Sequence, residues 1–118
     1  METIAERQLV LKSGDNALQV IVRLGAPVRD ESGLDWKCPF EIECGSDLRS
    51  MAIHGVDSMQ ALQLTICTLD GELELLARRM KGELCFQDGP FHSILEHGGL
   101  MKAPPPPPFD FSSGNDQT

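Results

Sequence analysis

The chain has no long apolar run. Among its 118 residues, no stretch approaches the roughly 18 consecutive apolar residues that suggest a membrane-spanning helix. The N-terminus begins Met-Glu-Thr-Ile and lacks the basic segment and apolar core of a secretory signal peptide. Cysteines in a chain without an export signal are expected to be reduced thiols. We therefore predict a cytoplasmic protein with no membrane partner.

The chain also lacks the spacings that hold metals, cofactors or phosphates. Structural zinc sites use ligand pairs about two to four residues apart, whereas no Cys-x-x-Cys occurs in this sequence. Gly98-Gly99 neither follows a predicted strand nor opens a predicted helix, so it does not have the context of a phosphate-binding loop. We predict no metal, no cofactor and no catalytic residues.

Basic residues are few. Ten Lys and Arg residues against 18 Asp and Glu residues give a formal net charge of −8. Arg78, Arg79 and Lys81 are clustered, but they fall in the last turn of a predicted helix, where cations complement the helix dipole. Because phosphate backbones are bound by clustered Lys and Arg, we predict no nucleic-acid partner. The charge fits a basic protein partner, or none.

The clearest strand in the sequence runs from Trp36 to Cys44. Apolar side chains occupy every second position, and Glu41 and Glu43 fall on the opposite face. This alternation is typical of an antiparallel sheet that is buried on one side and solvated on the other. Pro39 cannot donate to a strand ladder, so it places this strand at a sheet edge or at a bulge.

Weaker patterns complete the predicted fold. The turn residues at 13–16 join two strands into a hairpin. The expected strands besides 36–44 are 4–12, 18–24 and 48–54. Asp57 is a good N-cap for a helix over 58–81, in which apolar residues recur at steps of three and four. These residues are Leu62, Ile66, Leu69, Leu73, Leu76 and Met80.

Together these patterns predict an α+β fold. An antiparallel sheet of about four strands is expected to carry one long C-terminal amphipathic helix on one face. The predicted domain covers residues 1–82, and residues 83–118 are predicted to form a flexible, acidic, proline-rich tail. That tail contains Pro104, Pro105, Pro106, Pro107 and Pro108, followed by Phe109 and Phe111. Such a segment either docks in an aromatic groove of a partner or acts as a spacer.

Two runs carry a resemblance to a known family. The runs Trp36-Lys37-Cys38-Pro39-Phe40-Glu41-Ile42 and Gly55-Val56-Asp57-Ser58-Met59-Gln60-Ala61-Leu62 resemble those of a family of small, uncharacterised bacterial domains. The resemblance spans roughly residues 4–79. It implies a compact fold and a bacterial cytosolic origin, and it implies no activity.

The leading functional hypothesis is a non-enzymatic, acidic protein-interaction module, such as an immunity-type protein or an adaptor. Its candidate contact residues are Glu41 and Glu43 on the solvated sheet face and the aromatic and proline residues of the tail. Trp36 is either part of the core or an aromatic contact at the sheet rim.

Two alternatives remain open. One is a homo-oligomeric structural protein that pairs through the edge marked by Pro39 or through the back of the helix. The other is a small hydrolase-like enzyme that uses His54, Asp57 and Ser58.

Overall fold

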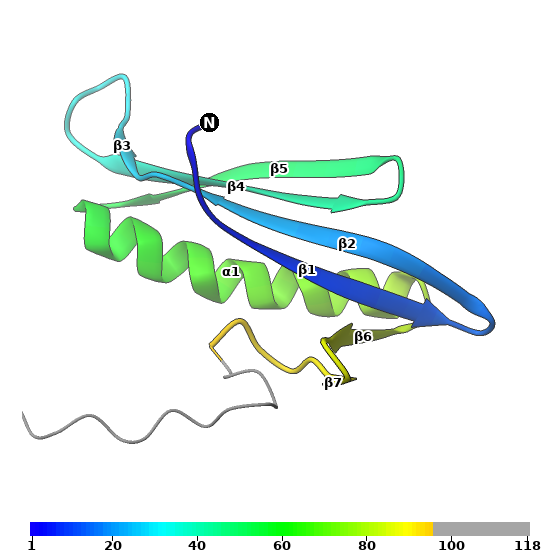
Figure 1. Ribbon diagram of the computed structural model, residues 1–118. Helices are drawn as coiled ribbons and strands as arrows, with labels where there is room; N and C mark the ends of the chain where they lie inside the picture. The colour runs from blue at the N-terminus through cyan, green and yellow to red at the C-terminus, as the bar shows by residue number, and fades with distance from the viewer. Residues whose placement is uncertain (96–118) are drawn as a thin grey trace, which may run out of the picture.

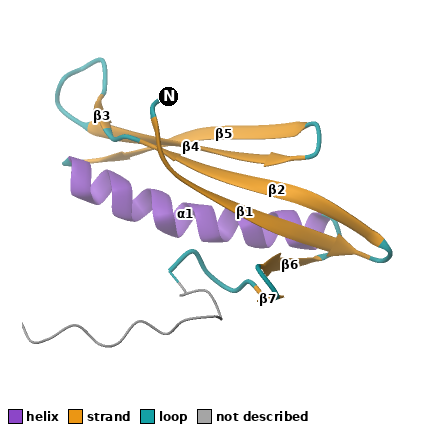
Figure 2. Ribbon diagram, in the orientation of Figure 1, coloured by secondary structure: helices purple, strands orange, loops and turns teal. Residues whose placement is uncertain are grey.

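The computed structural model describes residues 1–95 of the chain. Within this range, a long helix lies along one face of a twisted antiparallel sheet (Figure 1). Strands make up most of the ordered elements (Figure 2). The elements in chain order are β1 (Thr3–Ser13), β2 (Asn16–Gly25), β3 (Val28–Arg29), β4 (Trp36–Cys44), β5 (Asp47–Gly55), α1 (Ser58–Arg79), β6 (Glu83–Phe86) and β7 (Gly89–Pro90).

Two hairpins form the centre of the sheet. Strands β1 and β2 join through a two-residue turn that contains Gly14, and β4 and β5 join through a turn that contains Gly45. Both glycines have a φ of 61°, the left-handed backbone that tight hairpin turns require. The strand order is β5, β4, β2, β1, β6, β7, and the short β3 pairs with the start of β4. The two outermost strands are therefore β5 and β7.

The predicted fold class was wrong in its strand count and in the place of its helix. The sheet has seven strands rather than about four, and α1 lies in the middle of the described chain because β6 and β7 follow it. Strand β6 pairs with β1 and places the buried Leu84 opposite Leu11. A strand of four residues with one buried position shows no periodicity, so the sequence pattern did not reveal it.

The prediction that Pro39 marks a sheet edge or a bulge was also wrong, and the register between β4 and β5 runs past Pro39 without a shift. Strand β4 is interior, with β5 along one side and β2 and β3 along the other. The pairing with β2 ends at Phe40, and the pairing with β3 begins at Lys37. Pro39 therefore lies in the gap between the two neighbours, where a residue without an N–H costs no ladder hydrogen bond.

The core lies between α1 and the inward side chains of the sheet. Phe40 and Ile42 of β4 are buried in one apolar cluster with Leu69, Leu73 and Leu76 of α1, so the helix packs on one face of the sheet as predicted, although Trp36 is not part of this cluster. Nearer its N-terminus the helix is rotated relative to the prediction, since it buries Ala61 and Thr65 and leaves Leu62 and Ile66 half-buried.

A buried threonine is tolerated because its hydroxyl is bonded. Thr65 Oγ1 donates to the carbonyl oxygen of Ala61 at 2.7 Å, and the carbonyl oxygen of Cys38 on β4 lies 3.3 Å from the same hydroxyl. A satisfied buried hydroxyl avoids the desolvation penalty that an unpaired one would carry. Sequence periodicity counts only apolar residues, so it missed this position.

The helix begins where its cap predicts. Asp57 has extended backbone angles, and its carboxylate accepts a hydrogen bond from the Gln60 backbone N–H at 2.7 Å. The Gln60 side chain accepts in return from the backbone N–H of Val56 at 2.8 Å. Asp57 is confirmed as the N-cap. Among residues 1–95, no helix has the length and apolar character needed to cross a membrane.

The chain beyond the helix folds back onto it. The Asp70 carboxylate accepts from the Ser93 hydroxyl and from the Ile94 backbone N–H, both at 2.8 Å. The Arg7 guanidinium donates to the Ile94 carbonyl oxygen at 3.2 Å and lies over the Phe86 ring, 4.3 Å from its centroid. Part of the segment predicted as tail is thus bonded to α1 and β1.

Candidate interaction site

One face of the sheet is left uncovered by the described chain. Figure 1 shows α1 and the segment after it on the same side of the sheet. Because neighbouring residues of a strand point to opposite faces, the polar positions of β1, β2 and β4 form the second, outer face. We call this the outer face. It is the solvated face that the alternation of β4 predicted.

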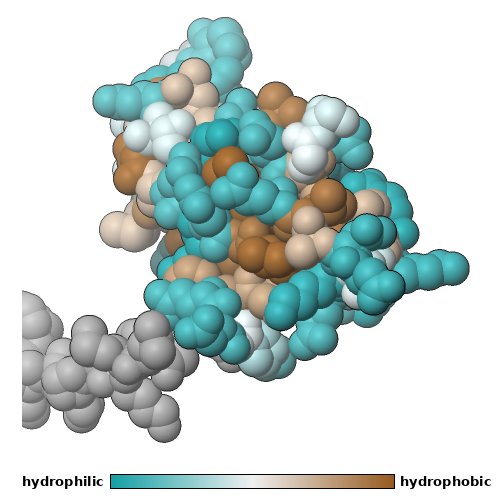
Figure 3. Space-filling model, turned by 45° about the vertical axis from the view of Figure 1, so that its right-hand side comes forward, coloured by the Kyte–Doolittle hydropathy of each residue, from teal (hydrophilic) through white to brown (hydrophobic). Residues whose placement is uncertain are grey.

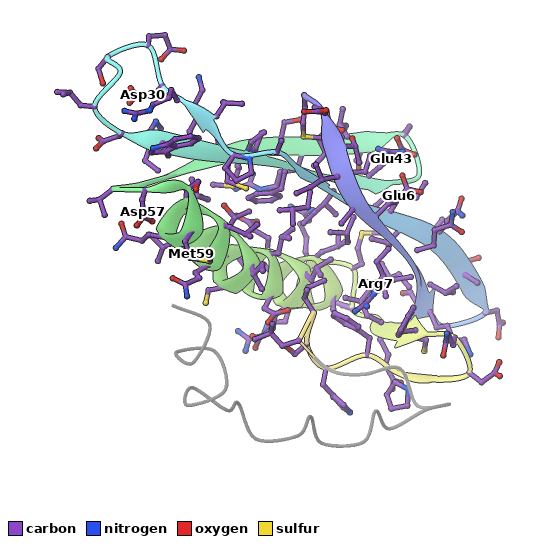
Figure 4. All side chains as sticks on the ribbon, turned by 60° about the vertical axis from the view of Figure 1, so that its left-hand side comes forward. Glu6, Arg7, Asp30, Glu43, Asp57 and Met59 are labelled. Carbon is purple, nitrogen blue, oxygen red and sulfur yellow. The ribbon has the colours of Figure 1, made fainter. Side chains whose placement is uncertain are left out.

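A charge cluster occupies the centre of the outer face. The cluster consists of Glu6 on β1, Arg23 on β2, and Glu41 and Glu43 on β4. Glu6 lies opposite Arg23 in one strand pair, and Arg23 lies opposite Glu41 in the next. The Arg23 guanidinium is 3.3 Å from a Glu6 oxygen, 3.4 Å from a Glu43 oxygen and 3.8 Å from a Glu41 oxygen. Figure 4 labels Glu6 and Glu43, which lie on the same side of the ribbon.

The cluster carries an excess of negative charge. Three carboxylates share one guanidinium, and the Arg23 side chain is 23% exposed. Ion pairs this exposed contribute only about 0–1 kcal/mol each to stability. Their main physical effect is therefore the negative electrostatic field that they create at the surface. Three paired strands hold these charges in a rigid, solvent-facing site.

Sequence reasoning found two of the four cluster residues. Glu41 and Glu43 were predicted on the solvated face, and the structure brings them together around Arg23. Glu6 and Arg23 were missed, although the two-residue turn at Gly14-Asp15 sets the register that places them opposite each other. The hairpin register was therefore the signal that could have found them.

Trp36 lies at the start of β4 on the inward side and is half-buried. The Arg29 guanidinium of β3 lies over its ring, 5.1 Å from the centroid. A cation over an aromatic face is a stabilising arrangement. Trp36 is not part of the apolar cluster between α1 and the sheet, so it is a half-buried residue at the end of β4, held against Arg29.

The acidic loop next to Trp36 is bonded within itself. The Ser32 hydroxyl donates to the Asp30 carboxylate and lowers the pKa of Asp30. The Lys37 ammonium lies 2.7 Å from a Glu31 oxygen and lowers the pKa of Glu31. The Lys37 ammonium balances the charge of Glu31, whereas the neutral Ser32 hydroxyl orients the Asp30 carboxylate without balancing its charge.

The candidates for chemistry do not assemble into one site within residues 1–95. The Asp57 carboxylate caps α1, and no hydrogen bond links it to His54 or Ser58. No group of three or more His, Cys, Asp or Glu residues in this part of the chain is placed to hold a metal ion. Burial raises the pKa of the Cys38 and Cys44 thiols, which makes them poor nucleophiles.

A second surface feature is the open edge of β5. Strand β5 pairs with β4 along its whole length and with no other described strand. Beside it, a groove of about 610 Å³ runs between β5 and the C-terminal half of α1. Its lining is Ile42, Cys44, Asp47, Leu48, Arg49, Ser50, Glu72, Leu75, Leu76 and Arg79. Figure 3 shows a hydrophobic patch framed by hydrophilic residues on the face turned toward the viewer.

The tail candidates lie outside the described residues. These are Pro104, Pro105, Pro106, Pro107, Pro108, Phe109 and Phe111.

Comparisons with known proteins identify a family and no activity. No curated protein and no solved structure matches the chain. One family model, described as a domain of unknown function (DUF6968), matches residues 5–94. The match begins in β1 and extends past β7, so it includes the strands that follow the helix. It confirms the predicted resemblance to a family of uncharacterised domains. The chain belongs to the DUF6968 family.

Proposed function

We propose that this protein is a non-enzymatic interaction module that binds a basic protein through the outer face of its sheet. The observation that carries the proposal is the cluster in which Glu6, Glu41 and Glu43 surround the single guanidinium of Arg23. An Arg or Lys side chain of a partner would supply the positive charge that this cluster lacks. An immunity-type or adaptor role in a bacterial cytoplasm is the specific form we favour.

The geometry suits fast, charge-guided binding. The cluster residues lie on β1, β2 and β4, three adjacent strands, so little conformational entropy is lost when a partner docks. The net charge of −8 extends the negative field around them. Charge complementarity of this kind raises association rates, and added salt weakens it because the Debye length is about 8 Å at physiological ionic strength.

The test compares two double variants that change the net charge equally. Glu41→Gln/Glu43→Gln removes charge from the cluster, and Glu31→Gln/Glu74→Gln removes it from a loop and from the exposed helix surface. The tagged proteins are incubated with lysate of the source cell, and bound proteins are eluted with a salt gradient. We expect wild type and the control to retain the same basic protein, and the cluster variant to lose at least about ten-fold in affinity for it.

The choice of glutamine isolates charge from shape. Glutamine keeps the size of the glutamate side chain and can still accept a hydrogen bond from Arg23. Equal retention of the basic protein by the cluster variant and wild type would rule out the outer face. Equal losses in both double variants would show that net charge alone matters and would contradict a specific site.

A further inference from the structure

The open edge of β5 and the adjacent flank of α1 form one continuous surface. On this flank, Leu64, Thr68, Gly71 and Leu75 follow steps of four, three and four residues, so they lie in one line along the helix. We call this line the flank stripe. Leu64 is 43% exposed and Leu75 is 58% exposed, so the stripe presents two leucine side chains to solvent.

The flank stripe is on the β5 side of the helix. Leu75 lines the groove together with Leu48 and Arg49 of β5. Glu72, one turn from Thr68, forms an ion pair with Arg49 at 2.9 Å. The opposite flank carries Asp70, whose carboxylate is bonded to Ser93 and Ile94. Within the described part of the chain, one flank of α1 is thus covered by the returning segment, and the stripe faces the edge of β5 that no described strand pairs with.

We propose that a second copy of this chain occupies this surface, with β5 pairing antiparallel to β5 and α1 packing beside α1 across a two-fold axis. The proposal is independent of the outer-face function, because such an axis runs perpendicular to the sheet and leaves both outer faces free. Long exposed edge strands in monomers are normally shielded by charge, proline or a covering segment. Strand β5 has nine residues, contains no proline, and carries its two charged residues, Asp47 and Arg49, near its start.

The helix position supports this arrangement. Thr65 contacts β4 through the Cys38 carbonyl, and Glu72 contacts β5 through Arg49, so the axis of α1 runs above the space between these strands. Neighbouring strands are about 4.8 Å apart, so the two-fold axis would lie half of this spacing outside β5, and the helix axis lies about half of it inside β5. Each helix axis would therefore be roughly 5 Å from the two-fold axis. The two helices would then lie roughly 10 Å apart, within the range at which helices pack.

The flank stripe is symmetric about its own centre. In an antiparallel pair of helices centred between Leu69 and Asp70, Leu64 of one copy meets Leu75 of the other, and Thr68 meets Gly71. The same centre suits the strands. Ala61 lies over Gly55 and Glu72 over Arg49, so the centre of the stripe, between Leu69 and Asp70, lies over the middle of β5, between Ser50 and Met51. The strand and helix pairings can therefore share one two-fold axis.

Charge and area are compatible with a second copy. Strands centred on Met51 place Arg49 opposite Ile53 and Asp47 opposite Gly55, so no like charges face each other. A strip about 30 Å long and about 20 Å high, from strand edge to helix flank, covers roughly 600 Å² on each copy. The total of roughly 1,200 Å² reaches the lower range of stable protein interfaces. Leu64 of the second copy would also cover the mouth of the groove beside Leu75.

The test exploits the symmetry of the flank stripe. One variant carries Leu64→Lys/Leu75→Lys, and another carries Leu64→Glu/Leu75→Glu. Each places like charges opposite each other in the proposed dimer, and a mixture of the two places opposite charges together. Mass is followed by sedimentation equilibrium with the full chain. We expect the wild-type protein to have twice the 12.9 kDa chain mass. Each variant alone should have the chain mass, because its affinity for a second copy is lowered about 100-fold or more. The mixture of the two variants should form dimers again.

Controls separate this interface from general effects. Val28→Glu/Leu34→Glu changes two exposed residues in the region before β4 and should leave the dimer intact. Recovery of dimers in the mixture also shows that both stripe variants fold. Wild type at the chain mass throughout, stripe variants that remain dimers, or a mixture that stays monomeric would each overturn the proposal. So would a dimer whose β5 amide hydrogens exchange as fast as those of the monomeric variants.

Discussion

Replacement of Phe40 by alanine is expected to lower the free energy of unfolding by about 3–5 kcal/mol, the usual cost of removing a buried phenylalanine side chain. Phe40 is fully buried at the centre of β4, and β4 is flanked by β2 on one side and β5 on the other. It belongs to the apolar cluster that joins the sheet to Leu69 and Leu73 of α1. The loss includes both the burial of the ring and the cavity that rigid strands cannot close.

Urea unfolding followed by the fluorescence of the single tryptophan measures this effect. Trp36 lies on the same strand and reports on the sheet. Leu34→Ala is the control, because Leu34 is 80% exposed and its loss should change stability by less than about 0.5 kcal/mol. Similar midpoints for the two variants would contradict the placement of Phe40 between helix and sheet.

Replacement of Gly55 by alanine is the second large expected effect. Gly55 ends β5 directly beneath the first turn of α1, and an added methyl carbon would overlap the Ala61 nitrogen and lie 2.8 Å from Ala61 Cα. Both are backbone atoms, which cannot rotate away as a side chain can. We expect a loss of about 3 kcal/mol, the upper end of the usual cost of overpacking.

Gly71→Ala is the matched control for this substitution. A methyl carbon at Gly71 meets nothing within 4 Å among residues 1–95. Because glycine costs a helix interior about 1 kcal/mol relative to alanine, dilute Gly71→Ala protein should be more stable than wild type by roughly that amount. Thermal unfolding in dilute solution distinguishes the two substitutions by the opposite signs of their effects. A neutral Gly55→Ala would show that the helix does not start against the end of β5.

The elements that could be predicted are those whose residues repeat. The alternation from Trp36 to Cys44 gave β4 with both bounds correct, and Asp57 marked the start of α1. The hairpin of β1 and β2 was predicted from the turn residues at 13–16. The strands that were missed are β3, β6 and β7, which contain two to four residues each and are too short to show an alternation. The pairing of β6 also depends on β1, which is distant in sequence.

Position within the sheet was harder to predict than the strands themselves. Pro39 indicated a sheet edge because proline has no backbone N–H to donate to a neighbouring strand. The sequence does not show that β2 and β3 leave a gap beside this residue, where no such donor is needed. The same limit applies to the candidate site. Glu41 and Glu43 follow from the alternation of one strand, whereas their contacts with Arg23 depend on the register between strands. Local patterns thus identified the outer face but not its arrangement.

The most direct test of the proposed function locates the binding of a basic ligand on the sheet. An arginine-rich peptide is titrated at low salt into isotope-labelled protein, and the amide resonances are followed by NMR. Saturable shifts are expected around Glu6, Arg23, Glu41 and Glu43, and the Glu41→Gln/Glu43→Gln protein should lose them while Glu31→Gln/Glu74→Gln keeps them. Shifts spread evenly over the acidic surface, or shifts confined to the helix side, would contradict an outer face built to bind a basic partner.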